Sequence, residues 1–132
     1  MIVPTIHFPG TCHDAITLYK TVFPMTEKTI TYYRDAPPNS GITITEEMVD
    51  QVMHASITLC GTQLHCSDSQ SGVVPGNMIL FNVFMESEDE VCKAFEKLTI
   101  DGEVIVDLGP QFFSKMYGSV VDRFGIRWQL IA

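Results

Sequence analysis

The chain has 132 residues, of which 45% are hydrophobic, and this is enough apolar material for the core of one domain. Its formal net charge of −8 repels nucleic-acid phosphates and anionic lipid head groups, so we expect neither a nucleic-acid nor a membrane partner. Because the first ten residues do not resemble a signal peptide and no apolar run approaches the roughly 20 residues of a membrane span, we expect a cytoplasmic protein with four reduced cysteines.

A strand and a helix open the chain. Residues 2–8 are mostly β-branched and apolar, and Pro4 predicts an interruption in the pairing of this strand. Thr11 is expected to cap the helix that follows, and Pro24 is expected to end it. The apolar face of this helix recurs at helical spacing and comprises Ala15, Tyr19 and Val22.

Further strands are expected in the first half, at residues 29–34, 52–60 and 62–67. The intervening segment, residues 35–50, is rich in Pro, Gly and polar residues, which predicts a long surface loop with a helical turn at 45–50. This loop is a candidate lid.

The second half repeats this order of elements. A strand is expected at residues 78–85, followed by a capping box of Ser87 and Glu90 at the start of a helix. The capping positions Thr11 and Ser87 are 76 residues apart, and the same spacing of 76 separates Tyr19 from Phe95. Three more strands are then expected at 103–107, 115–122 and 126–131.

This internal repeat predicts an α+β fold of two tandem βαβββ units, at about residues 1–67 and 77–132, joined by a connecting loop. Each helix is expected to cover one face of a curved mixed sheet, with both sheets in a single domain spanning residues 1–132. The other faces are expected to enclose a cavity for a small molecule.

Strand alternation predicts which side chains face that cavity. In the strand at 52–60, the apolar residues suit the helix side and leave His54 on the opposite face. By the same rule His65, Arg127 and Gln129 face the cavity. The candidate ligand-binding residues are therefore His54, His65, Arg127 and Gln129, with the aromatic residues Tyr32 and Phe113 as candidate walls. The alternatives are a histidine held by a neighbouring hydroxyl or carbonyl, and aromatic side chains that belong to the core.

Several segments together resemble a known family. They are LYKTVF at 18–23, VMHASITLCG at 52–61, PGN at 75–77 and YGSVVDRFGIRWQLI at 117–131. In order and spacing, over nearly the whole chain, they resemble the PhnB-like group of the glyoxalase, bleomycin-resistance and dioxygenase superfamily, also called vicinal oxygen chelate proteins. The resemblance implies the glyoxalase/bleomycin-resistance fold and a homodimer.

In metal-dependent members of that superfamily, the resemblance places ligands at positions that are here Pro4, His65, Leu80 and Gln129. Pro4 and Leu80 carry no donor atom in their side chains, so no cofactor is expected. His65 and Gln129 remain weak candidates for a divalent metal.

The principal hypothesis is thus a PhnB-like protein that binds a small molecule without a metal and has no assignable reaction. Two alternatives stay open: a metal-dependent lyase, dioxygenase or thiol transferase, and a structural or regulatory dimer without a ligand. Relatives also carry a demethylubiquinone methyltransferase label, but no glycine-rich loop of the kind that holds an adenosyl cofactor follows a predicted strand.

Overall fold

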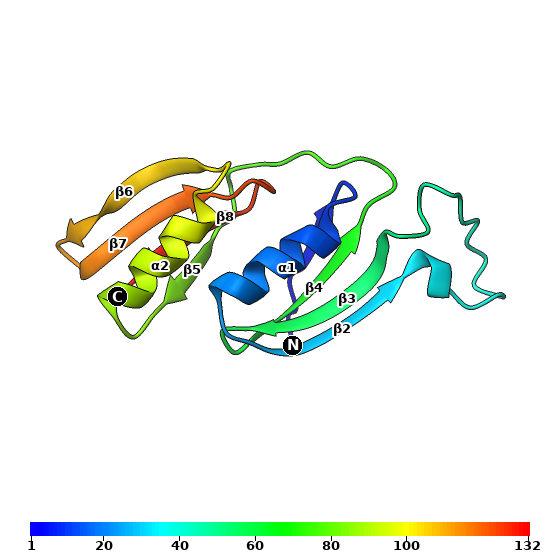
Figure 1. Ribbon diagram of the computed structural model, residues 1–132, viewed down its shortest axis with the longest axis horizontal. Helices are drawn as coiled ribbons and strands as arrows, with labels where there is room; N and C mark the ends of the chain where they lie inside the picture. The colour runs from blue at the N-terminus through cyan, green and yellow to red at the C-terminus, as the bar shows by residue number, and fades with distance from the viewer. The chain divides into compact units, whose positions relative to one another are not determined.

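The repeat in the sequence becomes two β–α–β–β–β units, each with one helix and one four-stranded mixed sheet (Figure 1). The computed structural model describes residues 1–132, and these divide into the units Met1–Val73 and Val74–Ala132. The predicted α+β fold of two repeated units is confirmed. Neither helix has the length and apolar character needed to cross a membrane.

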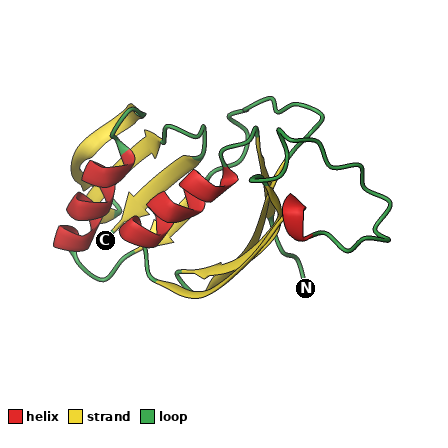
Figure 2. Ribbon diagram, turned by 45° about the vertical axis from the view of Figure 1, so that its right-hand side comes forward, coloured by secondary structure: helices red, strands yellow, loops and turns green.

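The elements of the first unit are β1 (Thr5–Phe8), α1 (Cys12–Val22), β2 (Met25–Tyr32), β3 (Val52–Leu59) and β4 (Thr62–Asp68), with a short 3₁₀ turn η1 (Tyr33–Asp35) after β2. The strands lie in the order β1-β4-β3-β2, with β1 parallel to β4 and the other pairs antiparallel. Figure 2 shows that the long strands of this sheet bend along their length.

Two strands of the first unit begin at other residues than predicted. β1 begins at Thr5 because Pro4 has no N–H to donate, and only its carbonyl pairs, accepting from the His65 N–H at 2.9 Å. β2 begins at Met25, four residues earlier than predicted. Residues 26–29, which follow Met25, are all polar and exposed along the sheet edge, so this part of β2 lacks the apolar alternation from which strands are predicted.

One face of the first sheet is covered by α1, and the core lies between them. The largest fully buried side chains there include Phe8, Tyr19 and Ile57. A β-bulge in the pairing of β2 with β3 adds Val52 to the core, where it is fully buried, while the neighbouring Met53 is half-buried.

The start of α1 is capped by a residue from β4. Thr11 is the N-cap residue, but its side chain makes no capping hydrogen bond, so the predicted Thr11 cap is wrong. Instead, the buried carboxylate of Asp68 accepts from the Cys12 N–H at 2.9 Å and from the Val52 N–H at 2.8 Å. Asp68 therefore ties the helix start to two strands, a role that local sequence does not reveal.

Residues 36–51 form the loop that the sequence predicts between η1 and β3. Hydrogen-bonded turns occupy its end, where the Met48 N–H donates to the Thr45 carbonyl at 3.1 Å and the Gln51 N–H donates to the Met48 carbonyl at 2.9 Å. Arg34 and Asp50 form an ion pair across the ends of the loop. Its role as a lid stays a prediction.

The elements of the second unit are β5 (Phe81–Phe84), α2 (Glu88–Leu98), β6 (Glu103–Gln111), β7 (Ser114–Val121) and β8 (Arg127–Ile131), in the sheet order β5-β8-β7-β6. Ser87 caps α2 as predicted, because its Oγ accepts from the Glu90 N–H at 3.1 Å. The Glu90 carboxylate reaches back to the Glu86 N–H at 3.2 Å, one residue before the cap. The buried face of α2 comprises Val91, Ala94, Phe95 and Leu98.

Candidate functional site

Two histidines meet on the face of the first sheet that α1 leaves uncovered. His54 lies in β3 and His65 in β4, and their ring centroids are 4.7 Å apart with an edge-to-face angle of 78°. Because Ser56 is the register partner of His65, the two imidazoles occupy diagonal positions on neighbouring strands. The His54 side chain is exposed and His65 is half-buried, so both remain accessible.

A polar network continues from this histidine pair across the same face. The Gln63 amide donates to the Ser56 hydroxyl at 3.2 Å, and the same amide nitrogen lies 3.4 Å from the His65 Nε2. An amide nitrogen is only a donor, so His65 Nε2 is the acceptor in this contact. We call His54, His65, Ser56 and Gln63 the histidine face.

Two other predicted site residues, Arg127 and Gln129, lie in β8 of the second unit. The intervening Trp128 and the following Leu130 are buried, which places Arg127 and Gln129 on the sheet face opposite α2, as alternation predicts. Gln129 pairs in register with Asn82 and Ser119. Arg127 lines a pocket of about 350 Å³.

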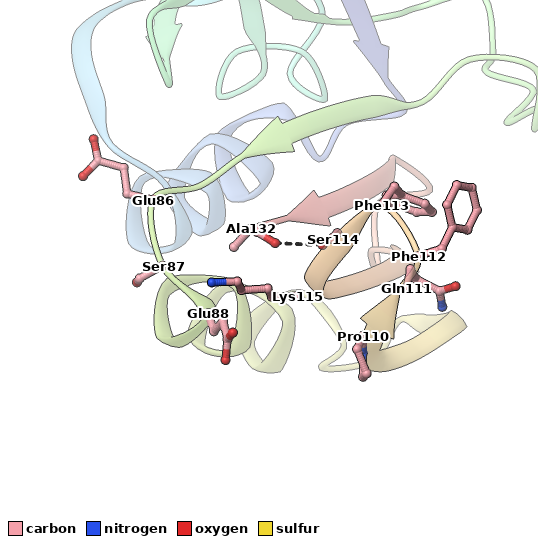
Figure 3. A pocket seen from close by; sticks show the side chains of 10 residues that line it. All are labelled: Glu86, Ser87, Glu88, Pro110, Gln111, Phe112, Phe113, Ser114, Lys115 and Ala132. Atoms are coloured by element: carbon pink, nitrogen blue, oxygen red, sulfur yellow. Dashed lines mark hydrogen bonds between the residues drawn. The ribbon is translucent and has the colours of Figure 1, made fainter.

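Phe113 lines a larger pocket of the second unit, with a volume of about 840 Å³ (Figure 3). Its ring lies 5.3 Å from that of Tyr117. Figure 3 shows the hydrogen bond that the Ser114 hydroxyl donates to the carbonyl of Ala132, at 2.8 Å. The charged side chains of this pocket are of both signs, Glu86, Glu88 and Lys115. Because these side chains carry charges of both signs, the pocket favours neither an anionic nor a cationic ligand.

Tyr32 lies on the α1 side of the first sheet. Its hydroxyl is 2.7 Å from His13 Nδ1 in α1, and the Arg34 guanidinium lies 4.6 Å from its ring centroid. Tyr32 is therefore not brought together with the histidine face. His13 is not among the predicted site residues, because no sequence signal joins two residues that are 19 positions apart in different elements.

The four cysteines are free thiols, and two of them are neighbours in the first unit. Cys12 and Cys66 are both buried, and the hydrogen bond between their side chains raises the pKa of Cys12, with burial and the charges of Cys66 and Asp68 acting in the same direction. Partial desolvation also raises the pKa of Cys60, which is an exposed residue. A raised pKa keeps a thiol protonated and unreactive, which fits a structural role.

A family described as 3-demethylubiquinone-9 3-methyltransferase matches residues 1–131. The chain belongs to this family. Its relatives include the protein YjdN of Escherichia coli K12, which is 24% identical over 96% of this chain and 91% of YjdN. A Bacillus cereus PhnB protein, described as a putative 3-demethylubiquinone-9 3-methyltransferase, is 28% identical in sequence with a TM-score of 0.78, covering 98% of this chain and 97% of its own.

The same fold occurs in a fosfomycin resistance protein, FosX of Listeria monocytogenes. Its structure has a TM-score of 0.66 at 10% identity and covers 100% of this chain and 90% of FosX. The chain is thus PhnB-like, and it has the fold that its sequence resemblance to vicinal oxygen chelate proteins implies.

The superfamily implies a divalent metal in some members, and the FosX structure is described as a complex with Mn(II). The donors of this chain do not fit such a site. Of the four implied positions, Leu80 has no donor, and the Pro4 carbonyl already accepts from the His65 N–H. A single imidazole and the neutral Gln129 amide are too few ligands, and carry too little charge, for a zinc, iron or manganese site. No cluster of three or more His, Cys, Asp or Glu side chains is arranged to hold a metal.

Proposed function

We propose that this protein binds a small organic ligand on its histidine face, without a metal. The observation that carries the proposal is the contact between the rings of His54 and His65, 4.7 Å apart on the uncovered side of the first sheet. The core of the unit lies on the other side, so neither ring is needed to fill it. Two accessible imidazoles beside a hydroxyl and an amide form a set of polar groups suited to orienting a ligand.

The chemistry of these groups favours a polar ligand with both donors and acceptors. His65 presents its Nδ1–H once its Nε2 accepts from Gln63. The exposed ring of His54 adds a flat surface, on which an unsaturated group of the ligand can stack.

Binding is a better fit than catalysis for these residues. The Ser56 hydroxyl is hydrogen-bonded to the Gln63 amide, which cannot remove a proton from it. A nucleophile needs an adjacent base within hydrogen-bonding reach, and the two histidines are in contact with each other rather than with a serine. We therefore assign no reaction.

The methyltransferase in the family's description is not part of the proposal. The connection from β1 to α1 holds one glycine, Gly10, and the first helical N–H there is taken by Asp68. The first turn of α2 carries three acidic residues, Glu88, Asp89 and Glu90. Neither junction contains a glycine-rich loop of the kind that holds such a cofactor.

The test is a screen of small organic molecules by thermal shift, with matched histidine variants. We expect ligands that raise the melting temperature of the wild type and of His13→Ala, whose imidazole lies on the other side of the sheet. In His65→Ala these ligands should bind about tenfold more weakly or worse, as expected for loss of one or two hydrogen bonds.

Equal binding by His65→Ala and the wild type would contradict this assignment. So would a stoichiometric metal that the purified wild type retains and His65→Ala loses, because the ligand face would then be a metal site.

We further propose a cytoplasmic homodimer. Large apolar side chains of the second unit are exposed, among them Met78, Phe84 and Phe112, and a second copy of the chain would cover such a surface. The four free thiols fit a reducing compartment. Light scattering coupled to size exclusion should give the mass of two chains, and Phe84→Glu should shift the protein toward one chain. A monomeric wild type would contradict the proposal.

A further inference from the structure

A pocket of the second unit is built around Arg127. Its volume is about 350 Å³, which lies within the range of small-molecule sites, and it is lined by Pro75, Gly76, Asn77, Val121, Gly125 and Arg127. None of these side chains is acidic, although the chain as a whole carries a net charge of −8. The pocket is therefore a local positive site in an acidic protein.

The guanidinium of Arg127 differs from those of the two other arginines in the chain. Arg34 meets both a carboxylate and an aromatic ring, and Arg123 lies over the ring of Phe124 at 4.9 Å. Arg127 has neither kind of partner, and its one hydrogen bond runs from Nε to the Gly76 carbonyl at 3.4 Å. Its two Nη groups thus keep their donors for a ligand.

The wall of the pocket is held in place by Asp122, which is buried. Its Oδ1 accepts from the N–H groups of Phe124 at 2.9 Å and Ile126 at 3.0 Å, and its Oδ2 accepts from the Trp128 Nε1 at 2.9 Å. These bonds fix the turn that leads to Arg127. Because three donors already share this carboxylate, it competes little for the guanidinium.

We propose that the Arg127 pocket binds the oxyanion group of a small organic acid, either a carboxylate or a phospho group. Both present two oxygens to the planar fork of a guanidinium. The Asn77 amide supplies a further donor, and Gly76 has no side chain to keep an anion from the backbone. This inference is separate from the ligand proposed for the histidine face, since it uses other residues.

The three arginines make a direct test possible. In a ¹⁵N-labelled protein each arginine gives one side-chain Nε–Hε signal. The three signals are assigned by replacing one arginine at a time with Gln and noting which signal disappears. At constant ionic strength, benzoate, inorganic phosphate or both should shift the Arg127 signal in a saturable way and leave the signals of Arg34 and Arg123 in place. A shift with benzoate alone identifies a carboxylate site, and a shift with phosphate alone identifies a phospho site.

Calorimetry on variants gives the second readout. Arg127→Gln should weaken binding of the active anion about tenfold or more, since a charge-assisted hydrogen-bonded pair is lost, whereas Arg123→Gln should bind like the wild type. The inference is overturned if neither anion shifts the Arg127 signal, if all three arginine signals move alike, or if Arg127→Gln binds as well as the wild type. The arginine experiment does not depend on the ligand screen for the histidine face. His65→Ala keeps all three arginines, so this result can be interpreted even if that screen fails.

Discussion

Cys12 and Cys66 lie side by side in the core of the first unit, and their contact has a consequence for stability at high pH. The pKa of Cys12 is raised above its ordinary value of 9.0, first by the hydrogen bond with Cys66 and then by burial. As pH rises above that value, the unfolded chain releases this proton while the folded chain retains it. Folding stability from Cys12 is therefore present below about pH 9 and lost above it.

We expect the free energy of unfolding of the wild type to fall above pH 9 by up to about 1.4 kcal/mol per pH unit for this thiol. Cys12→Ala should fall less steeply, because one titrating group is gone. Val91→Ala, which makes a cavity in the second unit but keeps every thiol, should show the wild-type slope. Urea unfolding under reducing conditions at several alkaline pH values measures this. Parallel slopes for wild type and Cys12→Ala would show that Cys12 does not contribute.

The site residues differ in how far the sequence could predict them. Alternation is regular along the paired parts of β3 and β4, so it places His54 and His65 on one face. Their ring contact follows from the register of the two strands, which alternation alone does not give. Tyr32 adjoins a β-bulge and its hydroxyl meets a residue of α1, and both features arise only when the elements pack.

The two helices of the repeat begin in different ways, although their capping positions correspond in sequence. Ser87 caps α2 with its own hydroxyl, whereas α1 is capped by Asp68, 56 residues beyond Cys12. The spacing of apolar residues is enough to predict both helices, because that pattern is local. It is not enough to predict a cap that comes from another strand.

These caps give a matched set of substitutions. Ser87→Ala should cost about 1 kcal/mol in unfolding free energy, and Thr11→Ala much less, because the Thr11 side chain makes no capping bond. Asp68→Ala should cost more than either, about 2 kcal/mol or above, since it leaves two backbone N–H groups without their acceptor. Chemical denaturation measures all three. An equal loss for Thr11→Ala and Ser87→Ala would contradict the assigned caps.

At the scale of the whole molecule, the repeat at a spacing of 76 residues is what made the fold predictable. Each copy of the repeat contains one short amphipathic helix, which is not stable on its own because its apolar face must be covered. Two copies of the same element order therefore predict two sheets, each covered by one helix. The function is less predictable, because the superfamily fold carries many chemistries and this chain lacks donors at two of its implied metal positions. What remains distinctive is the pair of imidazoles on one uncovered sheet face.

The most direct measurement is therefore proton NMR of the histidine rings during titration with the best molecule from the screen. The chain has four histidines, so each Cε1–H signal can be assigned with single-site variants. We predict saturable shifts for His54 and His65, with the His13 signal unchanged. Binding that leaves both His54 and His65 unshifted would contradict the histidine face as the ligand site.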